Sequence, residues 1–350
     1  MALGKKDIIG LDIGSKHIKA VQLKANKGSH RLERLGITTL QPELIVDGSI
    51  LDSTHVVQAI KELIANTDIK AKNATLSVSG HSSVIIKRVS LPQMTEDELD
   101  EQIRFEAEQY IPFDIEDVSI DFQMLGPAEE ENMMDVLIVA VKKDKINEYV
   151  SVVKEAGLTP VVVDVDAFAL ENIYELNYAV KEGANVALVN IGASMININI
   201  LKGGISVFTR DSSVGGNLLT EALQREFTVS YANAEKLKQN EPVEGVSRED
   251  VKQTLARAYD DIISEVSRSF DYFRDTTSYE NIDEIILSGG VASSSDFCNA
   301  LAERAGIEVN VADPFKNIEV PESFDREYLK KVSPIVTVAV GLALRRVGDK

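Results

Sequence analysis

The chain has 350 residues, of which 44% are apolar, and its formal net charge is −19. This length predicts about two domains of roughly 150 residues each. With this negative charge, the sequence shows no basic footprint of the kind that nucleic-acid binding needs. No segment has the roughly 20 apolar residues of a membrane helix. The single Cys298 excludes an internal disulfide and fits a reducing cytoplasm.

The first predicted element is a β-hairpin over residues 8–23, "IIGLDIGSKHIKAVQL". A tight turn at Gly14 joins its strands, and one carboxylate, Asp12, interrupts the apolar run. Burying a charged carboxylate costs free energy unless it has a partner such as a cation, so Asp12 indicates a functional site. A helix near 54–66 and a strand at 74–80 are predicted next.

An acidic segment follows: residues 95–122 hold eleven acidic residues and one basic residue. A helix is predicted over 95–110, because Thr95 and Glu98 match a capping box and apolar residues recur at helical spacing. Further elements are predicted at 84–89, 117–125, 135–141 and 160–165 (strands) and at 145–156 (helix). Residues 84–165 are therefore expected to form an inserted αβ subdomain.

The hairpin pattern returns at residue 186 as "VALVNIGASMININILKG", 178 positions after the first copy. In this alignment Gly14 falls on Gly192, whereas Asp12 falls on Asn190. The repeat predicts two related α/β lobes. A long helix at 247–275 and a strand that ends at the glycine pair of "LSGGVASSSDF" are predicted downstream.

The paired turns predict a phosphate site between the lobes, because backbone N–H groups beside a glycine can approach an anion closely. The facing groups would come from Gly14 and Ser15 on one side, and from Gly192, Ala193 and Ser194 on the other. Asp12 could hold a hydrated Mg²⁺ beside the phosphates, and Lys19 could add a positive charge. By contrast, the Glu235 and Lys238 pair in "AEKLK" is by itself typical of a surface salt bridge.

Five segments resemble the ATPase signatures of the actin, Hsp70 and sugar-kinase superfamily: "GLDIGSKHIKAVQL", "ALVNIGASMINI", "AEKLK", "LSGGVASSSDF" and "SPIVTVAVGLALRR". Within it, "SLPQMTEDELDEQIRFEAEQYIPFDIEDVSIDFQML" and "VVVDVDAFALEN" resemble the PilM family of type IV pilus assembly, with the FtsA family next. The resemblance implies a duplicated actin/Hsp70-like (ribonuclease H-like) two-lobe α/β fold with an inserted αβ subdomain. It implies a first lobe from 1–83, 166–185 and 320–350, the insert at 84–165, and a second lobe at 186–319 with a helical subdomain at about 216–281.

The same resemblance implies ATP or ADP with Mg²⁺ as the cofactor. The residues expected to contact the nucleotide are Gly14, Ser15, Lys16, Lys19, Asn190, Gly192, Ala193, Ser194, Gly216, Glu235, Lys238, Gly289 and Gly290. Asp12 would hold Mg²⁺ through water, and Asp166 would orient the attacking water. Asn190 stands where the superfamily has a second aspartate, so weak or absent hydrolysis is expected, because an amide is neither a base nor a strong metal ligand.

The implied function is a cytoplasmic ATP-binding scaffold, held at the inner membrane through its partner and not inserted in it. The implied partner is the N-terminal tail of a PilN-like membrane protein, with the pilus motor ATPases as a further partner. We expect the tail to bind in a groove at the junction of the insert and the first lobe, where the apolar strands 84–89 and 135–141 would contact it. The alternative is that the insert's own helices cover both strands and that its acidic surface serves solubility.

Three other functions remain open. An FtsA-like membrane tether is disfavoured because "LRRVGDK" follows "VAVGLA" directly, which leaves no room for an amphipathic membrane helix. A small-molecule kinase of the same superfamily would need a catalytic base, for which Asp166 is the best candidate. The cytoplasmic part of a type II secretion protein fits less well, because no membrane span follows.

Overall fold

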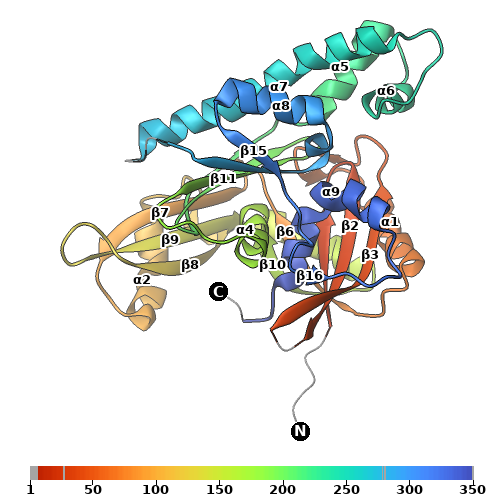
Figure 1. Ribbon diagram of the computed structural model, residues 1–350. Coiled ribbons are helices and arrows are strands. Elements are labelled where there is room, and N and C mark those ends of the chain that lie inside the picture. Colours follow the sequence, from red (N-terminus) through yellow and green to blue (C-terminus); the bar gives the residue numbers. More distant parts are fainter. Residues whose placement is uncertain (1–6, 27, 278, 280, 349–350) are drawn as a thin grey trace.

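The structure is a computed structural model that describes residues 7–26, 28–277, 279 and 281–348. The described residues form two lobes, each built on a mixed β-sheet, and a smaller sheet stands beside them (Figure 1). The outermost residues of the predicted first lobe, 1–6 and 349–350, lie outside the described part. No helix among the described residues combines the length and the apolarity needed to cross a bilayer.

The first lobe contains a six-stranded sheet in the order β10-β6-β1-β2-β3-β16. Its strands are β1 (Ile8–Ile13), β2 (His17–Asn26), β3 (Ser29–Thr39), β6 (Asn73–Val78), β10 (Thr159–Val165) and β16 (Ile318–Glu319). β1, β2 and β3 are antiparallel, whereas β6 and β10 run parallel to β1. Helices α1 (Ser53–Asn66) and α3 (Lys143–Glu155) bury their apolar sides against one face of this sheet.

The second lobe repeats this plan in a five-stranded sheet with the order β13-β12-β11-β14-β15. Its strands are β11 (Asn185–Ile191), β12 (Ile196–Lys202), β13 (Ile205–Ser212), β14 (Glu284–Ser288) and β15 (Glu308–Val311). The hairpin of β11 and β12 closes at Ile191 and Ile196, which correspond to Ile13 and Ile18 in the first lobe. The predicted duplication is therefore present in strand order, direction and register.

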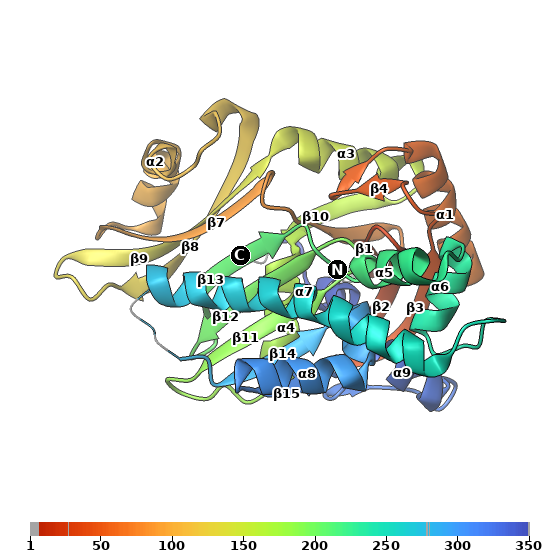
Figure 2. The ribbon, with the colours of Figure 1, turned by 90° about the horizontal axis from the view of Figure 1, so that it is seen from above.

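The helices that pack into the core of the second lobe are α5 (Asn217–Phe227), α6 (Tyr231–Lys238), α7 (Arg248–Thr276) and α8 (Ser295–Ala305). Seen from above in Figure 2, α7 and α8 lie over the second sheet, whereas α5 and α6 pack against α7 and lie toward the first lobe. α7 extends over the span predicted for the long helix, and its apolar stripe is buried in the lobe core. The 3-10 turn at Gly290–Ser293 connects β14 to α8.

Two helices lie between the sheets and join the lobes: α4 (Asp166–Asn177) and α9 (Arg326–Leu344). They approach each other closely at Gly341, where an added Cβ atom would lie 1.9 Å from the carbonyl oxygen of Ala169. Only glycine fits at such a crossing. α9 also holds the second lobe directly, because the carbonyl oxygen of Pro334 accepts a 2.8 Å hydrogen bond from the N–H of Gly289.

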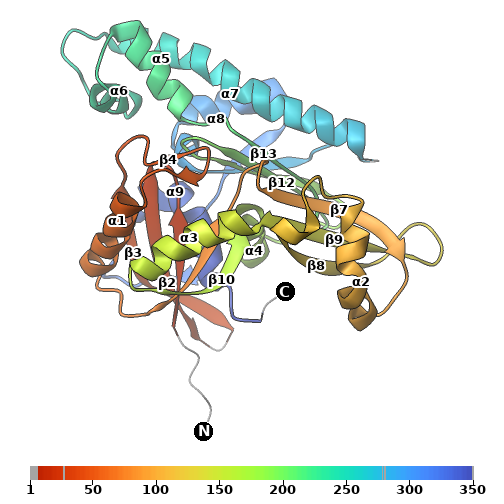
Figure 3. The same ribbon diagram turned by 180° about the vertical axis from the view of Figure 1, so that it is seen from behind.

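The smaller sheet has the order β7-β9-β8, with β7 (Val84–Pro92), β8 (Val118–Pro127) and β9 (Met133–Lys142). α2 (Glu96–Glu108) covers one face, and the predicted capping box of Thr95 and Glu98 is present. The predicted αββαβ unit is divided, however: β10 pairs with β6 in the first lobe, and α3 packs there beside α1 (Figure 3). The insert is therefore residues 84–142, because β10 finds a parallel edge at β6 rather than an edge of the small sheet.

Candidate functional site

A cavity of about 1000 Å³ lies between the two lobes, at the upper end of the size range of small-molecule sites. Every residue predicted for the site lines this cavity: Asp12, Gly14, Ser15, Lys16, Lys19, Asp166, Asn190, Gly192, Ala193, Ser194, Gly216, Glu235, Lys238, Gly289 and Gly290. Residues from sequence positions more than 270 apart thus meet in one place, which is the arrangement that a ligand bridging two lobes requires.

Asp12 has a charged partner in the hairpin that contains the first turn. Asp12 and Lys19 are opposite each other in the hairpin of β1 and β2, and Lys19 Nζ donates to Asp12 Oδ2 at 2.9 Å. The turn between them is closed by a 3.1 Å bond from the N–H of Gly14 to the carbonyl oxygen of His17. The carboxylate therefore has a cationic partner within its own hairpin, on the side that faces the cavity.

The second turn has the same backbone but neutral side chains. Gly192 N–H donates to the carbonyl oxygen of Met195 at 2.8 Å, as Gly14 does in the first turn. Asn190 and Asn197 occupy the positions of Asp12 and Lys19, and Asn190 Nδ2 donates to Asn197 Oδ1 at 3.1 Å. Sequence reasoning missed Asn197, although the offset of 178 places it on Lys19.

A chain of polar contacts continues from the second turn to the start of the insert. Asn197 Nδ2 donates to Asp211 Oδ1 at 2.8 Å, and Asp211 Oδ2 accepts the backbone N–H of Gly80 at 2.6 Å. Burial raises the pKa of Asp211 above its usual range, against the lowering effect of its hydrogen bonds. Asp211 therefore ties the second lobe to the segment that leads from β6 into β7.

The two lobes also touch across the cavity through Ser15 and Ser194, whose Oγ atoms are 2.8 Å apart, and through Lys16 and Glu235. The expected salt bridge of Glu235 and Lys238 is present at 2.6 Å, but it lines the cavity rather than the outer surface. Burial opposes the charge on Glu235, yet Lys238 and Lys16 lower its pKa to about 2. Burial and the neighbouring Lys16 lower the pKa of Lys238 to about 8.

The third turn brings glycine close to the backbone of β11. Gly289 has φ +89°, and an added Cβ atom would lie 2.2 Å from the carbonyl oxygen of Ile191. An added Cβ atom at Gly290 would meet no atom within 4 Å, so this residue faces open space in the cavity. A ligand can therefore approach the backbone of Gly290 directly.

The floor of the cavity carries Asp166 at the start of α4, where Ser77 Oγ donates to its Oδ1 at 2.5 Å. Burial and the nearby Asp12 raise the pKa of Asp166 to about 6. His17, also on the lining, is neutral, because burial and the adjacent Lys19 lower its pKa to about 3. Sequence reasoning missed Ser77 and His17, which no motif distinguishes from ordinary strand residues.

These groups fit a hydrated metal better than a metal held by protein alone. Within the described ranges, no three acidic, histidine or cysteine side chains are grouped as metal ligands. Mg²⁺ beside phosphates usually takes only one or two carboxylates and keeps several waters. Asp12 can serve in this way, and it lies close enough to Asp166 to add to the rise that burial causes in the pKa of Asp166.

The apolar strands predicted to bind a partner are largely covered. β7 and β9 pair with each other; Val89, Val136 and Ile138 are buried under α2, while Val84 and Val141 are buried in the first-lobe core. β7, β8 and β10 each end a sheet within the described part of the chain. β7 contacts β13 of the second lobe, whereas no strand pairs with the outer edges of β8 and β10 there. On β10, Val161 and Val162 are half-buried and belong to none of the main apolar clusters.

A family model described as type IV pilus assembly protein PilM matches residues 10–347. The structure is similar to that of a PilM–PilN type IV pilus biogenesis complex, with 27% identity, a TM-score of 0.85 and coverage of 98% of this chain and 99% of that chain. Two more distant matches are the ethanolamine utilization protein EutJ from Carboxydothermus hydrogenoformans (15% identity, TM-score 0.60, 98% and 91% covered) and MreB 5 of Spiroplasma citri bound to AMPPNP (15% identity, TM-score 0.53, 96% and 94% covered). These two share the fold, and the predicted actin-like two-lobe architecture is confirmed.

Proposed function

Because the chain belongs to the PilM family of type IV pilus assembly proteins, we propose that it is a nucleotide-binding scaffold of a pilus assembly complex. ATP or ADP with Mg²⁺ would bind in the cavity between the lobes, and the tail of a PilN-like membrane protein would bind at the insert. The partner would then hold the protein at the membrane.

The observation that carries the nucleotide proposal is the pair of opposed glycine turns across one cavity. Gly14 and Gly192 close two turns of the same geometry, and Ser15 and Ser194 of these turns are in contact. Backbone N–H groups from both lobes can therefore surround a phosphate chain. Glu235 and Lys238 would bind the ribose, and the open space at Gly290 would admit the base.

Asp12 would hold Mg²⁺ through water, and the bound ion would neutralise charge on the phosphates. Asp166, with a pKa near 6, is mostly ionised at neutral pH and could orient a water by accepting its hydrogen bond. Asn190 supplies no carboxylate on the opposite side, and its amide is already bonded to Asn197 and Ser288. We therefore propose binding with weak hydrolysis or none.

Thermal unfolding with and without Mg-ATP tests this proposal on protein shown to be free of nucleotide. Ligand at 100 times its dissociation constant should stabilise the native state by about 2.7 kcal/mol. Millimolar Mg-ATP that leaves the melting temperature unchanged would contradict nucleotide binding.

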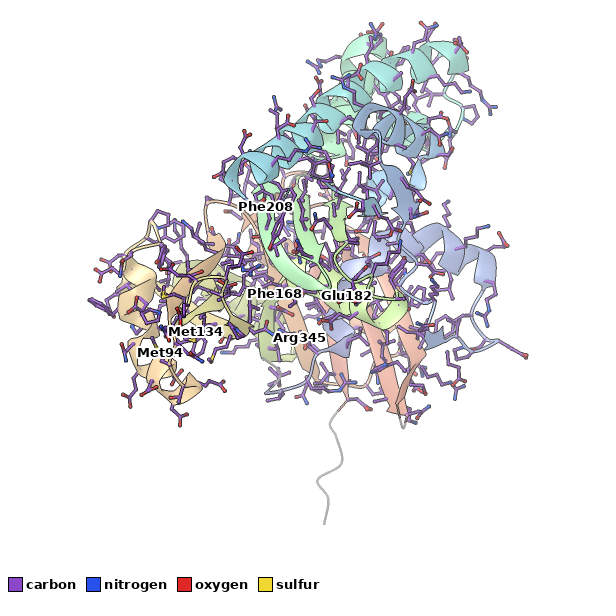
Figure 4. The ribbon with its side chains drawn as sticks, turned by 60° about the vertical axis from the view of Figure 1, so that its left-hand side comes forward. Met94, Met134, Phe168, Glu182, Phe208 and Arg345 are labelled. Carbon is purple, nitrogen blue, oxygen red and sulfur yellow. The ribbon has the colours of Figure 1, made fainter. Side chains whose placement is uncertain are left out.

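For the partner, we propose the junction between the outer edges of β8 and β10. Burial raises the pKa of Asp164 on β10, and the carboxylate of Asp121 on β8 adds to this rise, so these two side chains lie near each other. Arg345, just after α9, pairs there through its Nε with Asp164 Oδ2 at 2.7 Å. In Figure 4, Arg345 is labelled to the right of Met94 and Met134 of the insert. Unpaired strand edges offer backbone hydrogen bonds to an extended peptide, and Val161 and Val162 offer apolar contact.

Titration calorimetry with a synthetic PilN-like tail peptide tests the partner proposal. Binding in the micromolar range, about −8 kcal/mol, is expected with or without nucleotide. A peptide that binds equally well to protein lacking residues 84–142, if that protein still binds Mg-ATP, would place the partner elsewhere.

A further inference from the structure

We propose that Lys16 makes the cavity selective for phosphorylated nucleotides over nucleosides. Lys16 lies in the first turn, and its Nζ contacts Glu235 Oε2 on the opposite side of the cavity. Glu235 is also the carboxylate proposed to bind the ribose. The inference rests on the proposed nucleotide function, and it concerns which ligands that site accepts.

Glu235 has little capacity left for a ribose hydroxyl. Its Oε1 already accepts from Thr220 Oγ1 at 2.5 Å and from Lys238 Nζ at 2.6 Å, while Oε2 accepts from Lys16. Both side chains of the Lys16–Glu235 pair are mostly buried, with 18% and 11% of their surface exposed. At Oε2, a ribose hydroxyl must therefore replace the charged ammonium group of Lys16 as the donor. This exchange is unfavourable, because the hydroxyl is neutral.

The backbone at both ends of this contact is fixed, so the Lys16 side chain is the part that can move. The carbonyl oxygen of Lys16 accepts a 2.8 Å bond from the N–H of Leu40, which holds the first turn against the end of β3. On the other side, Glu235 is held within α6 by Lys238 and against α5 by Thr220. An exchange of partners at Lys16 thus requires rotation of one flexible side chain.

Phosphates can compensate for this exchange, whereas a nucleoside cannot. Lys16 follows Ser15, which touches Ser194 where the two turns meet, so a phosphate chain between the turns would lie beside Lys16. The ammonium group could leave Glu235 and bind phosphate oxygens, a charge-assisted contact of similar strength. Adenosine has no such group, and it would leave the displaced lysine without a strong partner.

The test compares the affinities of Mg-ATP and adenosine for the wild type and for Lys16→Met, by titration calorimetry. The loss of the lysine should strengthen adenosine binding and weaken Mg-ATP binding, so that the ratio of the two affinities falls by about tenfold or more. Lys236→Met is the matched control, because Lys236 is exposed on α6 beside Glu235, lies outside the cavity lining and makes the same change of charge. Its ratio should remain that of the wild type.

Adenosine that binds Lys16→Met no more tightly than the wild type would overturn the inference, as would an equal fall of the ratio in Lys236→Met. Lys16→Gln is a second variant, which keeps a hydrogen-bond donor. Its ratio of Mg-ATP affinity to adenosine affinity should lie between that of the wild type and that of Lys16→Met. The failure of the proposed function looks different: the wild type itself would then bind neither ligand. Wild-type binding of Mg-ATP with an unchanged ratio in both Lys16 variants would reject the role of Lys16 alone.

Discussion

Lys19 Nζ lies 2.9 Å from Asp12 Oδ2, and the two residues face each other across the first hairpin. The pair explains why a carboxylate is tolerated in an apolar strand. It also means that a metal ion at Asp12 would share its ligand with a lysine, so structural and binding roles must be separated by experiment.

Asp12→Asn should remove the dependence of ATP binding on Mg²⁺ and lower the stability of the ligand-free protein only slightly. The amide keeps a hydrogen-bond acceptor for Lys19, but it is a poor ligand for Mg²⁺. Calorimetric titration of ATP in Mg²⁺ and in EDTA measures the effect. An equal loss of affinity in both buffers would show that Asp12 acts only through Lys19.

Alanine should lower the unfolding free energy at Gly289 and the affinity for ATP at Gly290. Gly289→Ala places a methyl group 2.2 Å from the carbonyl oxygen of Ile191 at φ +89°, so we expect a loss of roughly 3 kcal/mol or more of unfolding free energy. Gly290→Ala meets no protein atom, so the ligand-free stability should stay within about 0.5 kcal/mol while ATP binding weakens. Urea unfolding and ATP titration of both variants provide the comparison. Unimpaired ATP binding by Gly290→Ala would show that the nucleotide lies elsewhere.

Asn190→Asp should destabilise the ligand-free protein and raise any ATP turnover. The new carboxylate oxygen would face Asn197 Oδ1 in place of the amide that donates to it, which leaves buried acceptors opposed and costs about 1–3 kcal/mol. The same carboxylate adds a ligand for Mg²⁺ on the second turn. Phosphate release under saturating Mg-ATP measures the turnover. A wild type that already turns over on the order of 10 per second would refute weak hydrolysis.

Asp166→Asn should stabilise the ligand-free protein at neutral pH but not in acid. The folded pKa of Asp166, about 6, lies above the unfolded value near 4, so the native state favours the protonated form. This contribution is present below pH 4 and is lost as the pH rises through 6, by roughly 3 kcal/mol. Urea unfolding followed by circular dichroism, from pH 4 to 7.5, should show the two proteins diverging across this window. A difference that does not vary with pH would contradict the shift.

Val162→Asp on β10 should abolish binding of the PilN-like tail and leave Mg-ATP binding unchanged. The substitution places a charge on a half-buried apolar edge, where a peptide would have to desolvate it. Phe105→Asp is the control, because Phe105 is 69% exposed on α2 of the insert, outside β10, and lies in the acidic face. Peptide binding that is lost in Phe105→Asp instead would move the site to the outer face of α2.

The elements of this fold follow from local patterns, whereas their assignment to sheets does not. The hairpins, α2 and α7 were predictable because turns, caps and apolar spacing are encoded in adjacent residues. The expectation that β10 belongs to the insert is wrong, because no local feature of "TPVVVDV" indicates which sheet edge the strand joins. That choice depends on β6, more than eighty residues earlier in the chain.

The same distinction applies to the site. Gly14, Gly192 and Gly289 could be found from turn signatures and from the repeat, and the structure brings them to one cavity. Two contacts could not be predicted, because they join segments far apart in the sequence. Lys16 and Glu235 are 219 residues apart, and Gly80 and Asp211 are 131 residues apart. β7 and β9 are buried partly in the first-lobe core and partly under α2, and the sequence of either strand alone does not predict this.

The two equivalent hairpins bear on the orientation of a ligand that lies between them. Their backbones are related by a pseudo-symmetry, but one carries the charged pair Asp12 and Lys19 and the other the neutral pair Asn190 and Asn197. A ligand lying across a truly symmetric pair of turns could bind equally well head-first or tail-first. Because the side-chain charges break that symmetry while the backbone preserves it, the proposed phosphate chain would bind between the turns with one end preferred on the side of Asp12 and Lys19.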